Sequence, residues 1–285
     1  MMKIAILGTE NSHAYAFAQL IRNSPKYKDI EIVGVYGYDA NANQRLLDEG
    51  LVPYAAKSPD EFLGKVDAIM VTARHGDHHH EYALPYVRQG IPAFIDKPFT
   101  VGLDRADELL SAAREHGALL CGGSSLKYLD EMNALARFRE SKHVVGGSVT
   151  APVSMVNEYG GFYFYAQHLI EILFSVFGTD VRTVYAKSHG DENRVSVIFD
   201  YGAYDVTAQF YDCYTYSATV FAKEGSMHAA VTDVTYCYEL ELDAFADMVR
   251  SGKMPHSYDS LLKPLKLMHC IEQSYLQKKE VAVVW

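Results

Sequence analysis

A lysine between an acid and a proline, Asp96-Lys97-Pro98, ends an apolar run that begins at Ala93. The run is typical of a buried β-strand, and proline stops a strand and fixes the path by which the chain leaves it. Open α/β sheets bind ligands at the carboxyl ends of their strands, so the Lys97 amine is placed for proton transfer or for binding a hydroxyl group. A surface turn with a solvated lysine is the alternative that this segment leaves open.

A second candidate for proton transfer is His168, which follows Gly160 and Gly161 on a predicted aromatic helix. Imidazole titrates near neutral pH and acts as an acid or a base with little adjustment. An interior histidine that only packs is the alternative. Glu171 lies three residues later, as in some helical metal sites, but no matching pair occurs elsewhere, and we expect no metal.

Strands alternate with helices in the first half of the chain. Apolar runs predict strands at 3–7, 30–35, 68–71, 93–95 and 119–121, and helical patterns lie after the first strand and at 42–49, 81–89 and 104–116. Repeated βα units imply a parallel sheet with helices on both faces. We therefore predict a doubly wound α/β domain over residues 1–123.

The second half changes to strands joined by turns. Strands are predicted at 146–153, 181–188, 194–199, 204–211, 216–222 and 281–284, and helices at 128–141, 165–177, 238–251 and 260–277. This pattern predicts an α+β domain over 124–285 with an open, mostly antiparallel sheet. The last strand, 281–285, is expected near the first domain.

Composition excludes several classes of protein. A net charge of −10 without a sustained run of Lys or Arg argues against a nucleic-acid partner. No apolar run is long enough to span a bilayer, and the first residues lead directly into a strand without a signal peptide, so we expect no membrane partner and a cytoplasmic location. The cysteines are dispersed and are expected to be reduced thiols: Cys121, Cys213, Cys237 and Cys270.

Several motifs together resemble the Gfo/Idh/MocA family of nicotinamide-dependent sugar and cyclitol oxidoreductases over essentially the whole chain. They are Asp96-Lys97-Pro98, the helix from Gly160 to His168, Tyr238 to Phe245, and Gly252-Lys253-Met254-Pro255. The resemblance implies an N-terminal Rossmann domain and hydride transfer between NAD or NADP and a hydroxyl or carbonyl group of a small sugar or cyclitol-like substrate. It implies Lys97 and His168 as catalytic residues, and a homodimer or homotetramer formed through the C-terminal sheet. The alternative is an inactive member that binds a sugar or another ligand and acts in regulation.

The expected cofactor turn departs from the family pattern. A dinucleotide fingerprint reads G-x-G-x-x-G, whereas this chain keeps only the first glycine in Gly8-Thr9-Glu10-Asn11-Ser12-His13. A Glu10 carboxylate facing the pyrophosphate at about 4 Å would cost about 4 kcal/mol. If Glu10 turns aside, the helix N-terminus, with the Ser12 hydroxyl and the backbone amides, can still hold an anion.

Other residues complete the expected cofactor site. Asp39 either binds the adenosine ribose, replacing an acid that the family carries where Gly37 stands, or caps the following helix, which we favour. Arg45 lies about one turn further along that helix, and the choice between NAD and NADP stays open. The resemblance places the segment Thr72–His80 beside the nicotinamide, and we expect one of its histidines near the cofactor and the others solvated. The residues that we expect to bind the cofactor are Gly8, Thr9, Glu10, Asn11, Ser12, His13, Asp39, Thr72, Arg74, His75, His79, Asp96 and Lys97.

The expected substrate site contains Lys97, Lys127, Tyr165 and His168. Phe164 stands where the family carries an aspartate that would orient the histidine or bind substrate. Tyr163 or Tyr165 supplies a hydroxyl instead, or both only pack. Lys127 reaches a substrate hydroxyl or is a surface charge, the interpretation that we prefer.

Overall fold

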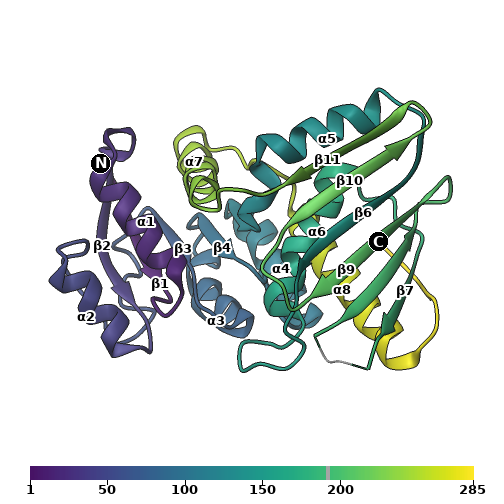
Figure 1. Ribbon diagram of the computed structural model, residues 1–285. Coiled ribbons are helices and arrows are strands. Elements are labelled where there is room, and N and C mark those ends of the chain that lie inside the picture. The colour runs from purple at the N-terminus through teal and green to yellow at the C-terminus, as the bar shows by residue number, and fades with distance from the viewer. Residues whose placement is uncertain (191–192) are drawn as a thin grey trace. The chain divides into compact units, whose positions relative to one another are not determined.

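The computed structural model describes residues 1–190 and 193–285, which form two compact units. The first unit contains residues 1–123 and 238–261, and the second contains 124–237 and 262–285 (Figure 1). Since each unit has its own sheet and its own core, each is described separately below.

The first unit is a five-stranded parallel sheet with the order β2-β1-β3-β4-β5. Its strands are β1 (Met2–Leu7), β2 (Ile30–Tyr36), β3 (Ala68–Val71), β4 (Ala93–Asp96) and β5 (Leu120–Gly123). Its helices are α1 (Ser12–Asn23), α2 (Ala40–Asp48), α3 (Gly76–Val87) and α4 (Leu103–His116), with the short 3-10 helix η1 (Pro25–Tyr27). The strand order reverses between β1 and β3, and ligands of such sheets bind at this switch point. The predicted doubly wound sheet is confirmed.

Helix α7 (Thr235–Ser251) supplies part of the core of the first unit. Phe245 is fully buried and meets Phe94 of β4 edge-to-face at 6.3 Å. Leu242, Ala246 and Met248 join the same cluster. The first unit therefore includes a helix that follows residue 123 by more than a hundred positions, because the apolar face of α7 is buried on the first sheet.

The second unit is a seven-stranded sheet with the order β11-β10-β6-β9-β8-β7-β12. Its strands are β6 (Val144–Pro152), β7 (Thr183–Ser188), β8 (Val195–Asp200), β9 (Asp205–Tyr211), β10 (Ser217–Ala222), β11 (Gly225–Ala230) and β12 (Val281–Ala282). Among the described strand pairs of this second sheet, only β6–β9 is parallel. The sheet is therefore mostly antiparallel, as predicted. Strand β12, the predicted last strand, pairs with β7 of this sheet.

The helices of the second unit cover one face of its sheet (Figure 1). They are α5 (Asp130–Glu140), α6 (Tyr163–Phe177) and α8 (Tyr258–Gln277), with the 3-10 helix η2 (Ser125–Tyr128) before α5. The helix predicted over 128–141 corresponds to α5. It begins at Asp130 because Leu129 before it has an extended backbone, with φ −66° and ψ 139°. Within the described parts of the chain, no helix has the length and apolar character needed to cross a membrane.

Candidate active site

The turn between β1 and α1 needs its glycine. Gly8 has φ +100°, and a Cβ there would lie 2.2 Å from the backbone nitrogen of Ala73 in the loop after β3. The buried Thr72 hydroxyl donates to the Gly8 carbonyl oxygen over 2.7 Å. Glycine alone tolerates both this backbone angle and this close approach. Gly8 and Thr72 therefore fix the shape of the turn.

Glu10 bridges the switch point of the sheet. Its Oε1 accepts a hydrogen bond from the Arg74 backbone N–H over 3.1 Å, which joins the β1–α1 turn to the loop after β3. Its Oε2 is buried and has no hydrogen-bond partner among the residues that the structure describes. The Glu10 side chain therefore places its carboxyl group where this type of sheet binds its ligand.

The N-terminus of α1 has amide groups that no side chain caps. The N-cap residue Asn11 makes no capping hydrogen bond, and the first turn contains no acidic residue. Instead, the Asn11 amide donates to Asp96 Oδ2 over 3.1 Å, and the exposed Ser12 hydroxyl donates to Asn11 Oδ1 over 3.4 Å. Uncapped first-turn amides, together with the helix dipole, favour an anion.

Asp96 connects the lysine turn to α1. This fully buried carboxylate accepts the Lys97 backbone N–H at Oδ1 over 2.7 Å, and its Oδ2 lies 2.6 Å from Nδ1 of His13. Burial alone would raise the pKa of Asp96, but the contact and charge of His13 and the charge of Lys97 hold it below its usual range. His13, which replaces the last glycine of the fingerprint, thus serves as a partner for the motif acid.

Lys97 lies at the end of β4 and is only 4% exposed. Burial lowers the pKa of the Lys97 amine. The charges of Asp96 and Glu241 raise this pKa, and the charge of Arg74 lowers it further. The alternative of a solvated surface lysine is therefore wrong. A buried amine with a lowered pKa can lose its proton and act as a base nearer to neutral pH.

Glu241 of α7 is a charged neighbour of Lys97 that our sequence analysis did not single out. It is 1% exposed, and its charge favours the protonated form of Lys97. The sequence contains a signal for it, because Tyr238, Glu241 and Phe245 share the spacing of one helix face. An acid within an apolar stripe is a candidate for a buried charge.

The histidines after β3 make specific contacts. His79 is fully buried, and its Nδ1 and Nε2 lie 2.6 and 2.7 Å from the carbonyl oxygens of Pro98 and Ala73. His75 caps α3 by accepting the Asp77 N–H, His78 stacks on Tyr82, and His80 pairs with Glu108. His79 is thus the buried histidine of this segment, and His75, His78 and His80 are partly exposed and make contacts of their own.

Asp39 caps α2, as we favoured. Its Oδ1 accepts the N–H groups of Asn41 and Ala42 over 2.9 and 3.2 Å. A Cβ at Gly37 would lie 2.0 Å from the Thr9 hydroxyl oxygen, so Thr9 occupies the space of the acid that the family carries there.

Arg45, the nearest arginine on α2, is engaged on the helix surface. Its Nε donates to Glu49 over 2.9 Å, and its guanidinium group lies 3.9 Å from the centre of the Tyr15 ring. Arg45, which we considered as a residue for binding the 2′-phosphate of NADP, is therefore already engaged with Glu49 and Tyr15.

In the second unit, His168 belongs to a buried polar cluster. Its Nδ1 lies 2.7 Å from the hydroxyl oxygen of Ser124, which is fully buried. Glu171 accepts the Ser124 backbone N–H over 3.1 Å and a hydrogen bond from Gln167 over 2.8 Å. Its other oxygen pairs with Lys127 Nζ over 3.0 Å. The preferred interpretation of Lys127 as a surface charge is wrong, because its side chain is only 11% exposed.

The aromatic residues before His168 pack together. Phe164 is 6% exposed and contacts Tyr159 and Tyr165, and Tyr163 donates to Glu272 over 2.9 Å. Tyr165 lies beside the His168 ring at 6.5 Å between ring centres. The residue bonded to His168 Nδ1 is therefore Ser124, which our sequence analysis did not identify.

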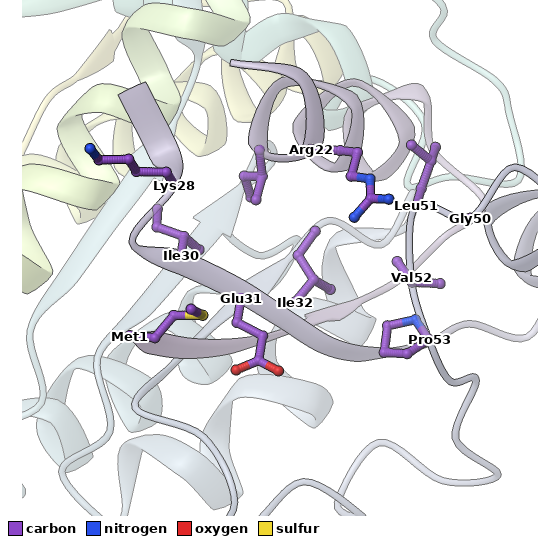
Figure 2. Close-up of a pocket in the computed structure, with 11 residues that line it drawn as sticks. Met1, Arg22, Lys28, Ile30, Glu31, Ile32, Gly50, Leu51, Val52 and Pro53 are labelled. Carbon is purple, nitrogen blue, oxygen red and sulfur yellow. The ribbon is translucent and has the colours of Figure 1, made fainter. Parts of the chain in front are cut away.

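A pocket with a volume of about 580 Å3 lies elsewhere in the first unit, and Figure 2 shows the residues that line it. It is lined by apolar side chains that include Ile30, Ile32, Leu51 and Val52, with Arg22 among its polar residues. Ile30 and Ile32 belong to the first residues of β2, the end opposite to the carboxyl edge. The cavity is therefore separate from the switch point.

The five-stranded parallel sheet, the glycine turn before α1 and the switch point between β1 and β3 define a Rossmann-type nucleotide-binding unit. Residues 2–124 match a family model described as "Oxidoreductase family, NAD-binding Rossmann fold". The model is that of the Gfo/Idh/MocA family, and its description as NAD-binding supports the expected NAD or NADP cofactor.

Individual proteins are also similar to this chain. An inositol 2-dehydrogenase of Ralstonia nicotianae is 31% identical over 91 residues, which cover 32% of this chain and a quarter (25%) of that relative. Among solved structures, a myo-inositol 2-dehydrogenase from Lactobacillus plantarum has a TM-score of 0.86 at 15% identity over 99% of each chain. GenD2 from gentamicin A biosynthesis, solved in complex with NAD, has a TM-score of 0.83 at 16% identity over 100% of this chain and 97% of that one. The structural matches establish the fold of the whole chain.

Proposed function

We propose that the protein is an oxidoreductase that transfers a hydride between NAD or NADP and a hydroxyl or carbonyl group of a small sugar or cyclitol-like substrate. The observation that carries the proposal is the buried Lys97, whose pKa is lowered, at the carboxyl end of β4. The family of residues 2–124 supports the reaction class. The inositol dehydrogenase relative supports a polyol substrate.

The residues of the first unit fit a dinucleotide at the turn and at the helix. Gly8 keeps the turn close to Ala73, and the first turn of α1 offers amide groups that no side chain caps. Glu10 is the exception, since its carboxylate lies on the Arg74 amide at the switch point. For a pyrophosphate to bind at this turn, we expect that carboxylate to turn aside, which lowers the affinity.

The cofactor supplies the hydride chemistry when it is bound. Lys97, in its unprotonated form, removes the substrate hydroxyl proton, and its ammonium returns that proton in the reverse direction. Asp96 holds the lysine turn through the Lys97 backbone N–H, and His13 and Asn11 hold Asp96. We assign a second acid-base or binding role to His168, and contacts with substrate hydroxyl groups to Lys127 and Tyr165.

A second candidate function is ligand binding without the cofactor. The observation that favours it is the Glu10 carboxylate, which occupies the switch point and has one buried oxygen without a hydrogen-bond partner among the described residues. A protein of this kind would keep a sugar-sized site and lose the hydride chemistry.

Titration with NADH and NADPH separates the two functions. Nicotinamide fluorescence and thermal shift are measured for the wild type, for Glu10→Gly and for Glu10→Gln, with the exposed Glu115→Gln as a matched control. We expect saturable binding by the wild type, and about tenfold to a thousandfold tighter binding by both Glu10 variants once the charge repulsion is removed. Binding by the Glu10 variants alone would favour the cofactor-free function, and binding by none of the proteins would reject the oxidoreductase.

A further inference from the structure

We propose that Ser124 fixes the tautomer of His168, so that the neutral imidazole carries its proton on Nε2 and acts as a hydrogen-bond donor to the substrate oxygen. This inference rests on the proposed function, and it makes Ser124 a positioning residue. It assigns to His168 the binding of the oxygen and not the exchange of a proton.

The contacts of the Ser124 hydroxyl group determine which atom donates the hydrogen bond between Ser124 and His168. Its oxygen accepts the Leu126 backbone N–H over 3.3 Å and lies 2.7 Å from His168 Nδ1. Ser124 is fully buried, so bulk water is not an alternative partner. Among the contacts described for Ser124, His168 Nδ1 is the acceptor that the hydroxyl hydrogen can reach. The O–H therefore donates to Nδ1, which must be unprotonated, and the neutral ring carries its hydrogen on Nε2.

The same contacts keep Ser124 in place. Its backbone N–H donates to Glu171 over 3.1 Å, and Glu171 is itself held by Gln167 and Lys127. The anchoring carboxylate thus bonds the Ser124 backbone, while the hydroxyl group bonds the imidazole. A serine that is fully buried and donates its hydrogen to a ring nitrogen is suited to orienting that ring. It is not placed to attack a substrate as a nucleophile.

This arrangement compensates for Phe164. The resemblance places an aspartate at that position, and an aspartate would accept a hydrogen bond from the imidazole N–H and favour the action of the ring as a base. Phe164 packs on Tyr159 and Tyr165 instead, and a neutral donor contacts Nδ1 from the residue before η2. The imidazole then donates through Nε2 instead of accepting a proton there.

Nitrogen NMR of the free protein tests the tautomer directly. The histidines are labelled with 15N, and the His168 signals are assigned by their loss in His168→Gln. At a pH where the ring is neutral, we expect a protonated Nε2 and an unprotonated Nδ1 that accepts a hydrogen bond. In Ser124→Ala, the ratio of the Nδ1–H to the Nε2–H form should rise about fivefold, because one hydrogen bond is lost.

Two further variants control this experiment. Ser124→Thr keeps the hydroxyl group and should restore the wild-type signals. Ser175→Ala is the matched control, because Ser175 lies on the same helix and its hydroxyl bonds the Glu171 carbonyl oxygen without contacting His168. A protonated Nδ1 in the wild type, or signals in Ser124→Ala identical to those of the wild type, would overturn the proposal.

A kinetic comparison tests the donor role itself. Glutamine keeps an N–H donor at position 168 and leucine does not, so we expect His168→Gln to retain at least tenfold more kcat/KM than His168→Leu, about the value of one good hydrogen bond. Equal losses in both variants would show that His168 acts as a base. The NMR result requires neither cofactor nor substrate, so failure of the tautomer and failure of the proposed oxidoreductase are distinguishable.

Discussion

At the residue scale, the environment of Lys97 predicts the pH dependence of the reaction. Burial lowers the pKa of this amine below the ordinary lysine value of 10.5, so the unprotonated base forms at lower pH than for a solvated lysine. The rate of substrate oxidation should rise with pH through that lowered pKa and level off before 10.5. A pH profile of kcat/KM measures it, and an acid limb at or above the ordinary lysine pKa would contradict the assignment.

Removal of the Lys97 amine should abolish most of the activity. We expect Lys97→Met to lower kcat by about a hundredfold to ten-thousandfold, the usual contribution of a positioned base, while cofactor affinity changes little. Lys97→Arg should be similarly inactive, because a guanidinium group does not lose its proton. The exposed Lys65→Met is the matched control, and activity retained in Lys97→Met would exclude Lys97 as the base.

His79 gives a second prediction at this scale, for stability against pH. Burial lowers its pKa below 6.5, although the two carbonyl oxygens and Asp96 favour the charged ring. The unfolded chain therefore binds a proton more readily than the native protein. The contribution of His79 to the free energy of unfolding is complete above about pH 6.5 and falls on acidification, by at most about 1.4 kcal/mol per pH unit.

Urea unfolding at a series of pH values between 7 and 5 measures this contribution. His79→Gln should lose part of the wild-type slope, whereas His116→Gln, which changes an exposed residue of α4, should keep it. A wild type that becomes more stable than His79→Gln on acidification would show that the native ring is charged and donates to both carbonyl groups.

At the element scale, α7 is predicted to be part of the first core although it lies late in the sequence. Phe245 is fully buried and contacts Phe94 of β4, so Phe245→Ala should lower the free energy of unfolding by about 3–5 kcal/mol. Leu276 of α8, which is 65% exposed, is the control, and Leu276→Ala should cost far less. A loss within about 0.5 kcal/mol of zero for Phe245→Ala would place α7 outside this core.

The strands differ in how strongly the local sequence predicts them. The alternation of apolar runs with helical patterns predicted the parallel sheet of β1 to β5, because parallel strands need crossover connections. Strand β11 was not predicted, since Gly225 to Ala230 contains no β-branched residue and only modest apolar character. The parallel pairing of β6 with β9 joins strands that are far apart in the chain, and local patterns contain no signal for it.

At the scale of the whole molecule, the open face of the second sheet is a candidate contact between copies of the chain. Large side chains on it are partly exposed: Tyr185, Ile198, Tyr211 and Phe221. Tyr185 and Ile198 are paired neighbours on β7 and β8. Partly exposed apolar residues gathered on one surface favour association, and we propose a homodimer or homotetramer formed through this face.

Light scattering coupled to gel filtration tests the assembly. Ile198→Arg should shift the protein toward the monomer, because it places a charge in the proposed contact. Leu276→Arg is the matched control, since Leu276 is 65% exposed on α8. A wild-type monomer, or an oligomer unaffected by Ile198→Arg, would reject this face.

The sequence by itself determined the doubly wound sheet and the strand end that carries Lys97, because these depend on short-range periodicity and on contiguous motifs. It also indicated the capping role of Asp39, which is a local contact. Tertiary structure alone decided that His13 pairs with Asp96, that Ser124 bonds His168 and that Glu241 acts on Lys97. Each of these pairs joins residues at least 44 positions apart, as Ser124 and His168 are. Such pairs form only when packed elements bring them together, and no local pattern specifies which buried partner a polar group will find.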